Sequence, residues 1–146
     1  MKLEVFALCD AAVDYAGKLS LLGAFDGIFA REAPVLHPQC AIALRLRVAR
    51  VEEGKHHLVL NFIDADGRLV MPSVNANFEV RIPPDRESIA VNLVLNIHQL
   101  RFGQFGEHAV DLAVDGRQEG SLPLMVVQRN GGPPPPAAPP PSEAAS

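Results

Sequence analysis

The residues of this 146-residue chain that could bind a metal ion are aspartates near predicted turns. Asp64 and Asp66 belong to the run Asp64-Ala65-Asp66-Gly67, and Asp10 follows the first apolar run. Ca²⁺ takes several oxygen ligands, which short acidic loops can supply. A hairpin turn explains the run without a ligand, because Asp and Gly suit the positive φ angles of such turns. We interpret the run first as a turn and keep Asp10, Asp64 and Asp66 as candidate Ca²⁺ ligands.

The other reactive residue types lack the spacing that a reaction centre needs. No serine lies in a Gly-x-Ser-x-Gly run. His37 and Cys40 would supply half of a zinc site, and the sequence contains no Cys-x-x-Cys. His56 and His57 are neighbours, so in a strand they point to opposite faces. Cys9 and Cys40 are expected to be buried and reduced. We therefore predict a protein that is not an enzyme and has no cofactor.

Two arginines on one predicted strand are candidate contacts for an anionic ligand or a partner. Arg45 and Arg47 share one face of that strand, since they are two residues apart. Pairing with acids on a neighbouring strand is the ordinary role of such residues. Asp111 and Asp115, which also share a face, are the expected partners in that case.

The composition excludes several classes of protein. The chain has 13 basic and 17 acidic residues, so its net charge is −4 and it has no basic surplus with which to bind nucleic acid. The apolar residues occur in short runs that are too short for a signal peptide or a membrane span. We therefore expect a cytoplasmic protein that binds neither nucleic acid nor a membrane.

Apolar and polar residues alternate along most of the chain, which is typical of strands with one face in a core. The fold predicted is all-β: an antiparallel two-sheet β-sandwich, immunoglobulin-like or related, of about eight strands, with a small barrel as the alternative. A single helical turn is predicted for 10–15, and Pro34 and Pro38 are expected to bracket a loop. The predicted strands are 3–8, 18–29, 40–48, 58–62, 76–82, 89–97, 110–114 and 122–127.

The predicted outward faces contain many small residues. Ala41, Ala43 and Val94 are among the positions expected to meet water. Only three lysines occur in the chain, although lysine is a common guard of sheet edges. We infer that an outer face or an edge strand meets a partner, such as a second copy of the chain, with Val94, Arg45 and Arg47 as candidate contacts.

The end of the chain differs in composition from the rest. Residues 130–146 hold more than half of the 13 prolines and no aromatic residue. This stretch cannot bury a core, so the sequence predicts a β-sandwich domain over 1–129 and a disordered Pro/Ala-rich tail over 130–146. Such a tail can act as a plain spacer or dock into an aromatic groove of a partner.

Several short motifs resemble those of a bacterial family of small all-β proteins of unknown function. The resemblance covers most of 1–129 and implies a β-sandwich without assigning an activity, a cofactor or a catalytic residue. The motifs are Leu8-Cys9-Asp10-Ala11-Ala12, Gly17-Lys18-Leu19, Leu22-Gly23-Ala24-Phe25, Asp64-Ala65-Asp66-Gly67, Gly106-Glu107-His108 and Asp115-Gly116.

These observations together predict a non-catalytic module that binds another protein or a second copy of itself. The alternative is a module that binds a small ligand or Ca²⁺ through its acidic loops.

Overall fold

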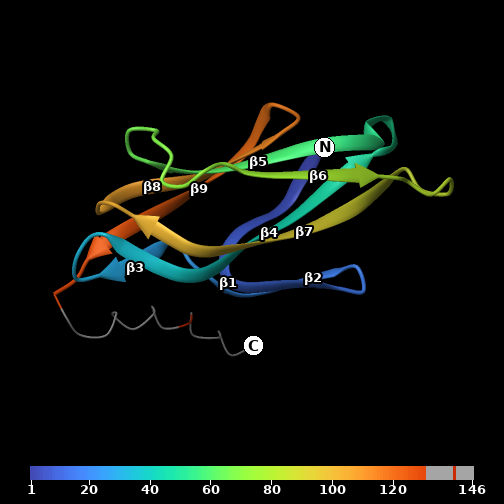
Figure 1. Ribbon diagram of the computed structural model, residues 1–146. Coiled ribbons are helices and arrows are strands. Elements are labelled where there is room, and N and C mark those ends of the chain that lie inside the picture. Colours follow the sequence, from blue (N-terminus) through green and yellow to red (C-terminus); the bar gives the residue numbers. More distant parts are fainter. Residues whose placement is uncertain (131–139, 141–146) are drawn as a thin grey trace.

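The computed structural model describes residues 1–130 and residue 140, and within them the chain forms nine strands and one short 3₁₀ helix (Figure 1). The predicted tail lies almost wholly outside the described residues. The elements are β1 (Lys2–Tyr15), β2 (Lys18–Ala24), β3 (Gly27–Ala30), β4 (Val35–Ala49), η1 (Arg50–Glu52), β5 (Gly54–Asp64), β6 (Val74–Val80), β7 (Ser88–Phe102), β8 (Gly106–Val114) and β9 (Arg117–Gln128).

The strands form two sheets, which confirms the predicted all-β, two-sheet class. Sheet A has the order β2-β1-β4-β7, and sheet B has the order β3-β9-β8-β5-β6. All pairs are antiparallel except β3 with β9, which is parallel. The prediction of one strand over 18–29 is wrong. The chain leaves sheet A at Phe25 and enters sheet B at Asp26, whose carbonyl accepts the Met125 N–H at 2.8 Å. This crossover explains the parallel pair.

The core lies between the two sheets and is built from alternate residues of the predicted strands. Burying each large side chain there contributes about 1.5–3 kcal/mol to folding. The predicted inward-facing residues are therefore confirmed for the central strands. Fully buried examples are Leu44 and Leu46 of β4, Leu58, Leu60 and Phe62 of β5, and Leu112 of β8.

Two local predictions near the ends of sheet A are wrong. Residues 10–15 form the end of β1 and not a helical turn, because they pair with β2 in an antiparallel hairpin. Pro38 lies inside β4 and not in a loop.

No helix among the described residues is long and apolar enough to cross a membrane.

The hairpin formed by the end of β1 and by β2, residues 10–24, folds across the outer face of sheet A. Figure 1 shows it on the side of β4 and β7 that faces away from β5 and β6. Ala41 and Ala43 beneath it are 1% and 0% exposed. The expectation that these alanines meet water is therefore wrong: their small side chains let the hairpin approach closely. Side chains packed on this second core are Ala12, Leu19, Leu21 and Val94.

Candidate functional site

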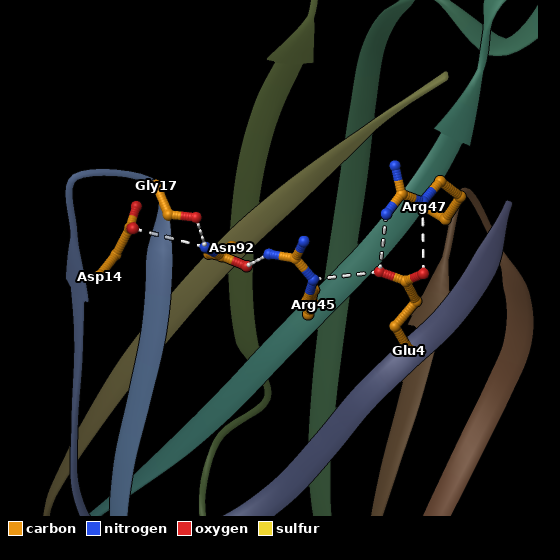
Figure 2. A network of polar contacts seen from close by, with 6 residues as sticks. All are labelled: Glu4, Asp14, Gly17, Arg45, Arg47 and Asn92. Carbon is orange, nitrogen blue, oxygen red and sulfur yellow. Dashed lines mark hydrogen bonds and ion pairs between the residues drawn. The ribbon is translucent and has the colours of Figure 1, made fainter. Parts of the chain in front are cut away.

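The two candidate arginines of β4 share one carboxylate on the outer face of sheet A. Arg45 Nε lies 3.0 Å from Glu4 Oε1, and Arg47 Nε lies 3.3 Å from Glu4 Oε2 (Figure 2). Hydrogen bonds from Arg47, and then from Arg45, hold the pKa of the Glu4 carboxyl below its usual value. The prediction that Asp111 and Asp115 pair with these arginines is wrong. Both aspartates lie in or next to β8, which belongs to sheet B.

Asn92 of β7 connects Arg45 to the tip of the hairpin. Arg45 Nη1 donates to Asn92 Oδ1 at 3.0 Å, and Asn92 Nδ2 donates to the Gly17 carbonyl at 3.1 Å and to Asp14 Oδ1 at 3.4 Å. Figure 2 shows this chain of contacts running from β1 through β4 and β7 to the hairpin. Arg45 therefore links Glu4 to the hairpin through Asn92, whereas Arg47 contacts Glu4 alone.

Sequence reasoning missed Glu4 and Asn92 because neither belongs to a recognisable motif. The register of β1 on β4 shifts between Leu3 and Val5. The sequence carries no sign of this irregularity, which lies at the residue that reaches both arginines. Asn92 was visible only as one polar residue in an alternating strand.

Val94, the third candidate contact, occupies two environments. Its side chain packs beneath the hairpin with Cys9, Ala41 and Ala43. Its backbone belongs to β7, the last strand of sheet A, which pairs with β4 on one side. The structure therefore leaves Val94 in the middle of a sheet edge.

This edge is long and carries no formal charge over most of its length. β7 spans 15 residues, and neither acid, lysine nor arginine occurs from Ser88 to Leu100. Residues 88–95 are all half-buried. Since β7 pairs only with β4 among the described strands, its other side presents backbone N–H and C=O groups to solvent.

The three candidate Ca²⁺ ligands are not brought together. Asp64 Oδ1 accepts the backbone N–H groups of Asp66 and Arg68, both at 2.9 Å, so this carboxylate stabilises the predicted turn. Asp10 lies in the hairpin of the other sheet, beside Gly23. The described part of the chain holds no group of three His, Cys, Asp or Glu side chains that could bind a metal ion.

A histidine cluster joins β5 to the turn between β8 and β9. His56 Nδ1 lies 2.6 Å from Asp115 Oδ2, and its Nε2 lies 2.6 Å from the Glu52 carbonyl. The hydrogen bond to Asp115 raises the pKa of His56 and lowers that of Asp115. The ring also stacks on Phe78, with 5.3 Å between centroids. Because both ring nitrogens are occupied, His56 has no free nitrogen with which to take a proton from a substrate.

His57 points to the opposite face, as predicted for neighbours in a strand. Its ring nitrogens lie 2.7 Å from Asn77 Oδ1 and 3.0 Å from Asn75 Oδ1, and these contacts raise its pKa. Asn75 Nδ2 donates to the Ser73 carbonyl, so its oxygen faces the ring and His57 Nε2 is the donor. Together the two histidines line a shallow hollow of about 530 Å³. The sequence offers no signal for the pairing of His56 with Asp115, 59 residues away.

The two cysteines are free and buried, in agreement with the expectation of buried, reduced thiols. Burial raises the pKa of the Cys40 thiol to about 11, and burial also raises that of Cys9. The thiolate form, which is the nucleophile, is therefore disfavoured at both positions.

Comparison with known proteins identifies a family without a described activity. No curated protein matches the chain. A Pseudomonas fluorescens structure, "alkylpurine DNA glycosylase AlkC bound to DNA containing an abasic site analog", is similar at 12% identity and a TM-score of 0.43; the match covers 86% of this chain and 30% of that one. The chain thus spans less than a third of that protein. A family of unknown function (DUF6941) matches residues 4–127, which confirms the resemblance to an uncharacterised family, and the chain belongs to this family.

Proposed function

We propose that this protein is a non-catalytic interaction module that binds a strand of another polypeptide along the free edge of β7. The observation that carries the proposal is the 15-residue edge strand β7, which has no formal charge from Ser88 to Leu100. Natural proteins protect exposed edges with charges, prolines, irregular backbone or short strands. An edge that lacks these devices over such a length is suited to pairing with another strand.

The other sheet edges in the described part of the chain are protected. β3 has four residues. β6 has seven, carries Glu79, and is followed by Pro83-Pro84. β2 has seven, begins with Lys18, and contains Gly23 at φ +68°. This contrast selects β7 as the binding edge.

Strand addition supplies both affinity and selectivity at such an edge. Backbone hydrogen bonds to the added strand provide affinity, and alternate side chains provide selectivity. On β7 the inward-facing residues, such as Leu93 and Leu95, are only half-buried beside the core. A paired strand would cover them, and the burial would add to the backbone bonds.

The absence of catalysis and a cytoplasmic location are parts of the same proposal. His56 and His57 use their ring nitrogens in intramolecular contacts, and the thiol pKa values of Cys9 and Cys40 are raised. These groups support a structural role better than a catalytic one. Two buried thiols kept as free cysteines are typical of a reducing compartment.

Site-specific photo-crosslinking in the native cell tests the binding edge. A photo-reactive phenylalanine analogue replaces Asn96, an exposed residue of β7, or Ser20, an exposed residue of β2 as a matched control. We expect a covalent adduct of defined mass from position 96 and none from position 20. If position 96 forms no adduct, or if both positions form the same adducts, the proposed edge is wrong.

A further inference from the structure

We propose that His56 is a proton-controlled latch that ties the short helix η1, and with it the loop leading into β7, to the turn between β8 and β9. The protonated ring holds both sides, and the loss of one proton releases η1. This inference goes beyond the proposed function, because it concerns the chain alone and its test needs no partner.

Both atoms that face the ring nitrogens of His56 can only accept hydrogen bonds. Nδ1 faces a carboxylate oxygen of Asp115, and Nε2 faces the carbonyl oxygen of Glu52, each at 2.6 Å. A neutral imidazole has one N–H and can satisfy one of them, whereas the imidazolium ion has two and satisfies both. The contacts are therefore complete only when His56 is charged. The hydrogen bond to Asp115 raises the pKa of His56, which moves its titration toward neutral pH.

The contact that a neutral ring would lose is the one to η1. A hydrogen bond to a carboxylate is about twice as strong as one to a neutral carbonyl, so the remaining proton stays on Nδ1 and points at Asp115. This carboxylate is also fixed by its other oxygen, which accepts the backbone N–H of His57 at 2.9 Å. Nε2 then presents a lone pair to the Glu52 carbonyl oxygen, and the two atoms repel. Loss of the proton therefore opens the η1 side of the latch.

The other charged groups near the ring do not replace His56 between Asp115 and Glu52. The Glu52 carboxylate is occupied by the amino group of Met1 and by the Ala49 N–H. Since an α-amino group can also titrate near neutral pH, the test has to separate it from His56. The remaining groups that line the hollows on either side of His56 are the bases Lys55, His57 and Arg117 and the acids Glu79 and Glu119.

The segment that is released is connected to the start of β7. Arg50, the first residue of η1, donates its backbone N–H to the Glu87 carbonyl at 3.0 Å. Its guanidinium donates to the Pro83 carbonyl at 2.8 Å and also to the Arg86 carbonyl. Residues 83–87 lead directly into β7, so a movement of η1 is transmitted to the entry of this strand.

Gly54 provides a point at which η1 can turn away from β5. It lies between Glu52 and His56, and its φ of +130° is a conformation that residues with a side chain rarely adopt. The ring folds back past this glycine to reach the carbonyl four residues earlier. No heavy atom lies within 4 Å of the position that a Cβ would occupy, so packing does not oppose a change in its backbone angles.

NMR spectroscopy of the full chain, from about pH 5.5 to about pH 9, tests the latch. The ring ¹⁵N shifts of His56 report which nitrogen carries a proton. We expect two protonated nitrogens below the midpoint and a proton on Nδ1 alone above it. Across the same midpoint, amide exchange in residues 50–53 and 85–88, corrected for the intrinsic rate at each pH, should rise about tenfold. A proton on Nε2 alone above the midpoint, or segments that do not respond, would overturn the proposal.

Three variants identify the titrating group. Asp115→Asn removes the charge but keeps the acceptor for the His57 N–H and suits the positive φ of 52° at this position, so the midpoint should fall by about one pH unit. His56→Gln should abolish the response of both segments. His57→Gln is the matched control and should leave the response unchanged, because that ring contacts Asn75 and Asn77 instead of η1. A response that persists in H56Q belongs to another group, such as the Met1 amine, and would overturn the latch, as would an unchanged midpoint in D115N.

Discussion

The two edge strands of sheet A, β2 and β7, differ in how far their unpaired backbone groups are protected. β2 is seven residues long, begins with Lys18, and bends away with the hairpin over the outer face of the sheet. β7 is 15 residues long and has no formal charge from Ser88 to Leu100. Both edges have unpaired backbone groups, but only β7 offers a long regular stretch of them. Apolar exposure alone is therefore a poor guide to a binding edge: Leu22 on the hairpin is 73% exposed.

The difference depends on the hairpin's position over Ala41 and Ala43. While the hairpin lies there, the chain itself covers the part of the outer face around Ala41 and Ala43, and the proposed binding edge of β7 is left uncovered by any described strand. Changes that lift the hairpin should alter stability without strengthening the β7 edge. Three substitutions test the hairpin, and a fourth tests a contact of sheet B that is independent of it.

Ala43→Leu should have the largest effect. Ala43 is fully buried beneath the hairpin, so a larger side chain must push the hairpin away or distort β4. We expect the free energy of unfolding to fall by about 1–3 kcal/mol, as measured by urea denaturation. Ala113→Leu is the matched control, since Ala113 is half-exposed on the outer face of β8. Equal losses in the two variants would show that the hairpin does not cover Ala43.

Gly23→Ala should have the next largest effect, because it acts on the bend of the hairpin. Gly23 has φ +68°, and an added Cβ would lie 2.9 Å from Asp10 Cγ. A left-handed conformation costs a residue with a side chain about 1–2 kcal/mol, and the contact with Asp10 adds to this cost. Thermal unfolding measures the loss. Gly103→Ala is the control, because Gly103 has open space around it and no positive φ; a similar loss there would contradict the role of the bend.

The alternating sequence predicted the strands and inward faces of the sandwich but not the layer outside it. Alternation distinguishes the two faces of Cys40–Val48, yet it cannot say what covers the outward one. Water and a hairpin are both compatible with Ala41 and Ala43. The hairpin itself was missed because the local sequence suggested a helical turn at 10–15. These residues instead pair with β2, a contact that the local sequence does not reveal.

The candidate residues show the same limit. Arg45 and Arg47 were correctly placed on one face, but their acid could not be identified without the register of β1 on β4. Pairing between distant strands also explains why His56 and Asp115 were not connected. Val94 was named as a candidate contact because it is an apolar residue among small ones on a face expected to meet water. The structure adds that it lies on the edge strand β7.

His56→Gln tests the contact of His56 in β5 with Asp115, in sheet B and away from the hairpin. The pKa of His56 is raised by Asp115, so this contact stabilises the fold fully below the unfolded pKa near 6.5 and is lost as pH rises through the folded pKa. The melting temperature of wild type should therefore exceed that of the variant more at pH 6 than at pH 9. The reverse pH trend in H56Q would contradict the contact with Asp115.

Glu4→Gln should have the smallest effect on stability. It tests whether the tip of the hairpin can loosen without a change in β7. Glu4 is the shared acceptor of Arg45 and Arg47, and Arg45 also holds Asn92, which binds the hairpin tip at Gly17. The glutamine keeps the shape and removes the charge, so amide hydrogen exchange should rise in residues 14–18 while the exchange of β7 and the mass in solution stay unchanged. Because the pKa of Glu4 is lowered, its contribution is present above pH 4.5 and is lost as pH falls through the folded pKa. Acidification of wild type should therefore reproduce the exchange pattern of the variant.

Glu79→Gln, which removes the exposed contact of Glu79 with Arg81 on the sheet B side, is the control and should leave the hairpin unaffected. If E4Q instead raises the exchange of β7 as much as that of residues 14–18, the hairpin and the edge act as one surface, and the separation drawn between them is wrong.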